Sequence, residues 1–126
     1  MEQAKRRIRK IKFNSIKNNE VMEVHSDLAL RYARILEDND EIVRYQCDVS
    51  LNASKYKFID SIGIKKSYFE NDWISHFKIW WKNGTVSVRE IVMQHDINRP
   101  STIQKLELSR RYWEQEGITD WKIVLA

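Results

Sequence analysis

The sequence predicts a single α/β domain built from a mixed sheet flanked by helices. Three observations lead to this fold class: a helix signal followed by a strand signal, a hairpin around an Asn-Gly pair, and a second helix followed by a last strand. The length of 126 residues suffices for one domain with one core. Apolar residues make up 42% of the chain and glycine and proline are few, which excludes the disordered and fibrous classes.

The first helix is expected to begin at Ser26, whose side chain is a good N-cap. Leu28, Tyr32 and Ile35 follow at helical spacing and predict the buried stripe, and the polar residues 38–40 end the helix. Residues 42–49 are rich in β-branched and aromatic side chains and predict a strand. Residues 52–70 show no clear period, so no regular element is predicted there.

The hairpin is expected from residues 73–81, a turn at Asn83-Gly84, and residues 86–93, because Asn-Gly supplies the positive φ angles of tight turns. Glu90 interrupts an apolar row on the second strand, where alternate residues share one face. A helix over residues 101–116 should end at Gly117, and residues 120–125 should form the closing strand. We also expect this helix to pack against the hairpin.

The positive charge is concentrated at one end of the chain. Residues 1–18 hold seven of the 22 Lys and Arg residues and one of the 18 acids, so we divide the chain into this basic arm and a near-neutral domain over residues 19–126. A basic arm is attracted to the phosphates of nucleic acid without regard to sequence. The alternative is a solvated terminus, or one that partly packs on the domain through its interleaved apolar residues. The expected DNA-binding residues are Lys5, Arg6, Arg7, Arg9, Lys10 and Lys12.

Several stretches resemble the catalytic domain of TnsA, the endonuclease subunit of heteromeric bacterial transposases. The stretch KLELSRRYWE at residues 105–114 is followed by WKIV at residues 121–124, and ILEDNDEIV at residues 35–43 resembles the end of the family's first helix. The resemblance covers residues 24–125 in outline. It implies a restriction-endonuclease-like fold, in which acids and a lysine gather around Mg²⁺ at the edge of a mixed sheet.

Most positions of that catalytic set are changed in this chain. Ala29 stands where the first helix of the family carries glutamate, although Asp27 is within about a turn of it. His76 takes the place of the central aspartate, with Asp72 four residues upstream. Glu90 is retained, but Val92 replaces the lysine. The resemblance therefore favours a protein with vestigial catalytic residues, and only Glu90 remains as a candidate metal ligand.

Each candidate also has a structural interpretation. Glu90 is expected to pair with Lys78 or His76 across the hairpin, and the alternative is a metal site that joins His76, His95 and Glu90. The five tryptophans are expected in the core or at an interface rather than as base-stacking platforms. Cys47 is the only cysteine, which excludes an internal disulfide and a cysteine-based zinc site.

The expected function is that of a non-catalytic accessory or regulatory factor in transposition or recombination of a mobile element. It would need no cofactor and would bind DNA and a transposase or site-specific recombinase subunit. One alternative is an active Mg²⁺-dependent endonuclease that uses Asp27, Asp72 and Glu90. Another is a phage or plasmid protein-binding module without DNA contact, with exposed tryptophans as its interface. No apolar run is long enough to span a membrane, and we expect a cytoplasmic location.

Overall fold

The chain has a mixed α/β fold in a computed structural model that describes residues 1–3 and 9–126. A five-stranded mixed sheet and a separate two-stranded hairpin are combined with two α-helices and three short 3₁₀ helices among the described residues. The elements are β1 (Glu2–Gln3), β2 (Ile11–Ser15), β3 (Glu20–Val24), α1 (Asp27–Glu37), β4 (Ile42–Ser50), η2 (Ala53–Phe58), η3 (Lys66–Glu70), β5 (Trp73–Trp81), β6 (Val86–Val92), η4 (Gln94–Asp96), α2 (Pro100–Gln115) and β7 (Asp120–Leu125).

Strand β5 is the centre of the five-stranded sheet. It pairs antiparallel with β4 over most of its length, with β6 over residues 77–80, and with the short β1 at residues 73–74. Strand β7 pairs parallel to β6, and the crossover between them is α2, as a parallel connection requires. The predicted hairpin, the strand over residues 42–49 and the closing strand are therefore confirmed.

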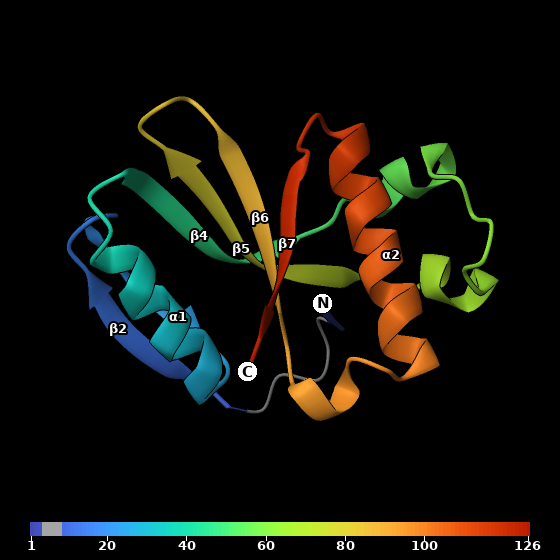
Figure 1. The fold of residues 1–126 in the computed structure, drawn as a ribbon, viewed down its shortest axis with the longest axis horizontal. Helices are drawn as coiled ribbons and strands as arrows, with labels where there is room; N and C mark the ends of the chain where they lie inside the picture. Colours follow the sequence, from blue (N-terminus) through green and yellow to red (C-terminus); the bar gives the residue numbers. More distant parts are fainter. Residues whose placement is uncertain (4–8) are drawn as a thin grey trace.

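The two helices lie on different sides of the strands and bury different parts of the core. Figure 1 shows α1 and β2 on one side and α2 on the other, with the turns η2 and η3 beyond α2. The first core cluster includes Val88, Leu108 and Trp113, and joins α2 to β5, β6 and residues 51–64. The second includes Ala33 and Phe77, and joins α1 and the β2–β3 hairpin to β4 and β5. The expected packing of the second helix on the hairpin is confirmed.

Helix α1 begins as predicted, because the Ser26 side chain accepts a hydrogen bond from the backbone N–H of Ala29. Its predicted buried stripe is wrong, because Leu28 and Tyr32 are only half-buried. The buried residues are Ala29, Ala33 and Leu36, whereas Ile35 is 61% exposed. The small alanines let the helix approach β4 and β5 closely, and this rotates the buried face away from Ile35.

The hairpin turn contains one positive φ angle rather than two. Gly84 has a φ of 88°, in the left-handed region, whereas Asn83 does not have a positive φ. The backbone N–H of Trp81 bonds to the carbonyl of Thr85, which leaves a three-residue loop of the kind that ends in a left-handed glycine. Gly117, with φ of 84°, follows the last turn of α2 as predicted.

The second half of the basic arm is part of the folded body. Residues 11–15 form β2 and pair with β3, and the Lys17 ammonium donates to the backbone carbonyls of Asn39 and Ile42. Arg9 forms an exposed ion pair with Asp27 at the start of α1. Lys5, Arg6 and Arg7 lie outside the described residues, while Lys10 and Lys12 are exposed. Among the described residues, no helix is long and apolar enough to cross a membrane.

Candidate functional site

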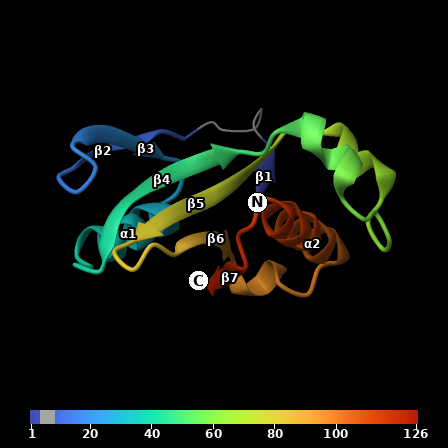
Figure 2. The same ribbon diagram turned by 90° about the horizontal axis from the view of Figure 1, so that it is seen from above.

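The candidate site lies where β6 separates from β5. Their backbone pairing ends at Phe77 and Arg89, so Glu90 has no backbone pairing partner on β5. At the start of β5, the neighbouring position is occupied by β1, where Glu2 pairs with Ile74. Figure 2 shows β1 beside β5, close to α2. The separation of two strands opens space inside the sheet, and in this chain the amino-terminal segment fills it.

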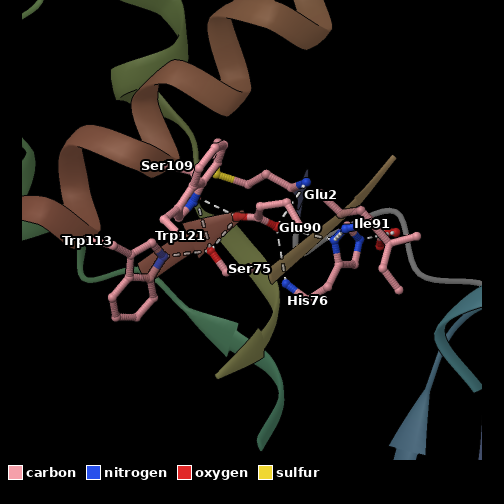
Figure 3. A network of polar contacts seen from close by, with 9 residues as sticks. Glu2, Ser75, His76, Glu90, Ile91, Ser109, Trp113 and Trp121 are labelled. Carbon is pink, nitrogen blue, oxygen red and sulfur yellow. Dashed lines mark hydrogen bonds and ion pairs between the residues drawn. The ribbon is translucent and has the colours of Figure 1, made fainter. Parts of the chain in front are cut away.

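Glu90 is the centre of this site and is fully buried. Its Oε2 accepts hydrogen bonds from the hydroxyls of Ser75, at 2.6 Å, and Ser109, at 2.5 Å. Its Oε1 accepts from the backbone N–H of His76 at 3.2 Å and lies 3.2 Å from the Met1 ammonium, which is also fully buried. Both oxygens of the carboxylate are therefore held by donors of the chain itself (Figure 3).

Two tryptophans support the serines that hold Glu90. The indole N–H of Trp113 donates to the Ser75 hydroxyl at 2.8 Å, and that of Trp121 donates to the Ser109 hydroxyl at 2.9 Å. Each serine thus accepts from an indole and donates to the carboxylate, which fixes the direction of its hydroxyl. Figure 3 shows both Trp–Ser pairs converging on Glu90. The pairs come from β5, α2 and β7, so the network connects the elements around β6.

His76 lies on the other side of Glu90. Its Nε2 is 3.1 Å from a carboxylate oxygen of Glu2, and its Nδ1 is 2.9 Å from the backbone nitrogen of Ile91 and 3.2 Å from Oε1 of Glu90. The neutral ring therefore accepts the Ile91 N–H at Nδ1 and donates to Glu2 at Nε2, whereas the charged ring can donate to both carboxylates. Burial and the Met1 ammonium lower the pKa of His76, but hydrogen bonds to Glu2 and Glu90 outweigh them, and the pKa is raised.

The charge of Glu90 is maintained inside the protein. Burial alone raises the pKa of a carboxyl group, because it removes water from the charged form. Here the Met1 ammonium and the hydrogen bonds from His76 and Ser109 outweigh burial and lower the pKa of Glu90 to about 2. Glu90 is therefore an anion at neutral pH whose counter-charge and hydrogen-bond donors are supplied internally.

The structure does not bring the other predicted acids to Glu90. Asp27 is at the start of α1 with Arg9, and Asp72 is exposed just before β5. His95 is an exposed residue next to Asp96. Within residues 1–3 and 9–126, no group of three or more His, Cys, Asp or Glu side chains is arranged to hold a metal ion. The predicted joining of His76 with Glu90 is confirmed, whereas His95 is not part of it.

Two further expectations are corrected by the side-chain positions. Lys78 does not pair with Glu90, because its ammonium lies over the rings of Trp80 and Trp113, 5.1 and 5.3 Å from their centroids. None of the five tryptophans is an exposed residue: Trp73 and Trp113 are buried, and the others are half-buried. The expectation that exposed tryptophans form an interface is therefore wrong.

Sequence reasoning missed most of the residues that hold Glu90. Ser109 had a signal, since it falls on the apolar stripe of α2 between Leu106 and Trp113 at spacings of three and four residues. A serine in such a stripe predicts a buried hydroxyl that needs a partner. Ser75 had a weaker signal, as a polar residue in an aromatic strand. The Met1 ammonium had none, because no pattern in a sequence reports where the terminus docks.

Comparisons with known proteins add no family to these observations. No protein-family model matches the chain, and no curated protein is detectably similar to it.

Proposed function

We propose that this chain is a TnsA-like protein of the restriction-endonuclease-like class that does not cleave DNA. It acts as an accessory or regulatory factor in the transposition or recombination of a mobile element. In that role it binds a transposase or recombinase subunit through its folded body and DNA through its basic arm.

The order of elements supports the fold part of this proposal. A helix, three antiparallel strands, a second helix and a parallel strand follow one another as α1, β4, β5, β6, α2 and β7. This order of elements also resembles that of the TnsA catalytic domain. The stretch at residues 105–114 lies in α2 and that at residues 121–124 lies in β7, as the resemblance implies.

The hydrogen bonding of both Glu90 oxygens within the protein is the observation that supports a non-catalytic function. A hard divalent cation needs carboxylate oxygens that face it and water. Both oxygens of Glu90 are instead held by the chain's own donors, and the buried Met1 ammonium lies 3.2 Å from one of them. Val92 and His76 supply neither the lysine nor the second acid of the cleavage chemistry. The arrangement therefore favours a carboxylate that stabilises the fold.

We expect the full chain to leave supercoiled DNA uncut in the presence of Mg²⁺ or Mn²⁺. The measurement is the conversion of supercoiled plasmid to nicked circles, with a metal-dependent nuclease as positive control. The same chain should be retained by a transposase or recombinase encoded beside it. Metal-dependent nicking that co-purifies with the chain and is lost in Glu90→Gln would contradict the proposal, as would failure to bind any recombinase of the same element.

We expect the basic arm to supply most of the affinity for duplex DNA, with little preference for sequence. Each phosphate contact contributes about −0.9 to the slope of log K against log salt. Replacing three arm residues by glutamine should therefore flatten the slope, and fluorescence anisotropy with unrelated duplexes measures it. The variant changes Arg7, Lys10 and Lys12.

Substitution is a better test than deletion, because Met1 contacts Glu90 and β1 pairs with β5. A matched control removes one arginine and two lysines from exposed positions of the body: Arg31, Lys82 and Lys122. An equal loss of affinity in both variants would show that the arm has no special role.

A further inference from the structure

We propose that residues 52–70 form a docking groove for an acidic segment of a protein partner, which inserts a large apolar side chain between η2 and η3. This inference rests on the proposed function, because it names the surface and the chemistry by which the body recognises its protein partner. It concerns a part of the chain that lies beyond α2, away from the strands that carry Glu90 (Figure 1).

The groove has a volume of about 560 Å³; apolar side chains form its floor, and Lys57, Ser61 and Lys66 add polar lining. Tyr56, Ile59 and Ile64 line it, and each is buried from one side by the core around α2. Phe69 of η3 closes the opposite wall, with its ring 6.3 Å from that of Tyr56 in an edge-on arrangement. The space is large enough to accept a leucine or phenylalanine side chain from a partner.

The groove is held in shape by hydrogen bonds to α2. The guanidinium of Arg111 donates to the backbone carbonyls of Asp60 and Ile62 at 2.6 and 2.8 Å. The side chain of Gln104 accepts from the backbone N–H of Lys65, and the Tyr112 hydroxyl oxygen accepts from the backbone N–H of Asn52. A site that exists before binding loses less conformational entropy when the partner docks.

Two large apolar side chains extend the apolar surface outside the groove. Phe58 is 70% exposed and Ile62 is 75% exposed, and each is adjacent in sequence to residues that line the groove. Scattered exposed apolar residues are normal on a protein surface, but two next to groove-lining residues add apolar area to the groove, as interfaces require.

The charge of the groove selects the partner. Both charged residues that line it, Lys57 and Lys66, are basic and exposed, and neither forms an ion pair with another described residue. The nearby Asp60 carboxylate accepts from the backbone N–H of Ile62. An acidic segment therefore complements the rim, and the apolar floor takes its anchor side chain.

The same features favour a protein over a nucleic acid. Single-stranded nucleic acid binds through aromatic faces on which bases stack along a continuous basic channel. Here the two aromatic side chains of the lining, Tyr56 and Phe69, pack edge-on against each other and against the core, and Ile59 and Ile64 supply aliphatic surface. Two lysines beside one short groove suit a short acidic peptide better than a phosphate chain.

A random peptide-display library, selected on the full chain, tests the inference. We expect enrichment of peptides that combine Asp or Glu with Phe, Leu or Trp. Affinity for the enriched peptides should fall by about tenfold or more in Lys57→Glu/Lys66→Glu and in Ile62→Ser, since buried anchors and their charged neighbours dominate such interfaces. Matched controls are Lys82→Glu, in the hairpin turn, and Ile16→Ser, which changes an isoleucine that is 92% exposed.

Each outcome decides between the two proposals. Enrichment of peptides without acids, no enrichment, or equal affinity for the groove variants and the wild type overturns the groove. The groove proposal is also overturned if the groove variants lose affinity for single-stranded DNA, or lose self-association, while they keep their affinity for the peptide. In these cases retention by a recombinase of the same element still supports the proposed function. If only the groove variants lose peptide binding, the groove is supported. If the wild type also binds no recombinase of the same element, the proposed function is contradicted.

Discussion

Replacing Glu90 by alanine is expected to lower the free energy of unfolding by about 3 to 5 kcal/mol, the effect of removing one partner of a buried ion pair. The Met1 ammonium is fully buried and loses its counter-charge. The hydroxyls of Ser75 and Ser109 lose their acceptor at the same time. Urea or thermal unfolding followed by far-UV circular dichroism measures the change.

A matched variant separates this effect from the loss of any glutamate. Glu114 is on the exposed face of α2 and forms an i,i+4 ion pair with Arg110. Glu114→Ala should cost only about 0.3 to 0.5 kcal/mol, as exposed helix pairs do. If Glu90→Ala were as mild as Glu114→Ala, the carboxylate would not be a structural centre. A role in metal binding would then deserve a new test.

The sequence was sufficient for the elements that depend on local pattern. Ser26, the Asn83-Gly84 turn and Gly117 mark boundaries through backbone chemistry, and the structure places the ends of α1, β5 and α2 close to them. The face of α1 was harder, because an isoleucine and an alanine compete for the core. Hydrophobicity favours Ile35, but the close approach of the helix to the sheet buries Ala33 completely.

The site was only partly predictable, because its contacts join residues that are far apart in the chain. An acid in an apolar row and a histidine on the neighbouring strand were enough to predict the pair of Glu90 and His76. The Met1 ammonium, Ser109 and Trp121 reach Glu90 from different elements. Register and strand separation determine these contacts, and neither is a local property of the sequence.

The weak pattern of residues 52–70 has the same kind of cause. The loop between η2 and η3 is held by tertiary hydrogen bonds rather than by helical periodicity: Arg111 donates to the carbonyl of Asp60, and Gln104 accepts from the N–H of Lys65. A segment held in this way is free to keep Phe58 and Ile62 on its outside. The absence of a secondary-structure signal and the presence of exposed apolar residues therefore have one explanation, which is a surface shaped by tertiary contacts.

Stability is expected to fall steeply as the pH drops from about 4.5 to about 2, and Glu90 should account for a measurable part of the loss. The folded pKa of Glu90 is about 2, below its ordinary value of 4.5. A depressed pKa means that the carboxylate contributes stability above pH 4.5, and the contribution is lost as the pH falls through the folded pKa. Urea unfolding at a series of pH values measures the free energy of unfolding.

Glu90→Gln isolates this contribution, because glutamine keeps the shape of the side chain and does not titrate. Glu37, Glu107 and Asp120 also have lowered pKa values, but they titrate in both proteins and cancel in the comparison. The variant should be less stable than the wild type at pH 6, and the two curves should converge toward pH 2. On the other side of neutrality, the raised pKa of His76 predicts stability that is present below about pH 6.5 and is lost as the pH rises through its folded pKa. Curves for wild type and Glu90→Gln that stay parallel from pH 6 to pH 2 would show that folding does not lower the pKa of Glu90, and a stabilising ion pair with Met1 would be disproved.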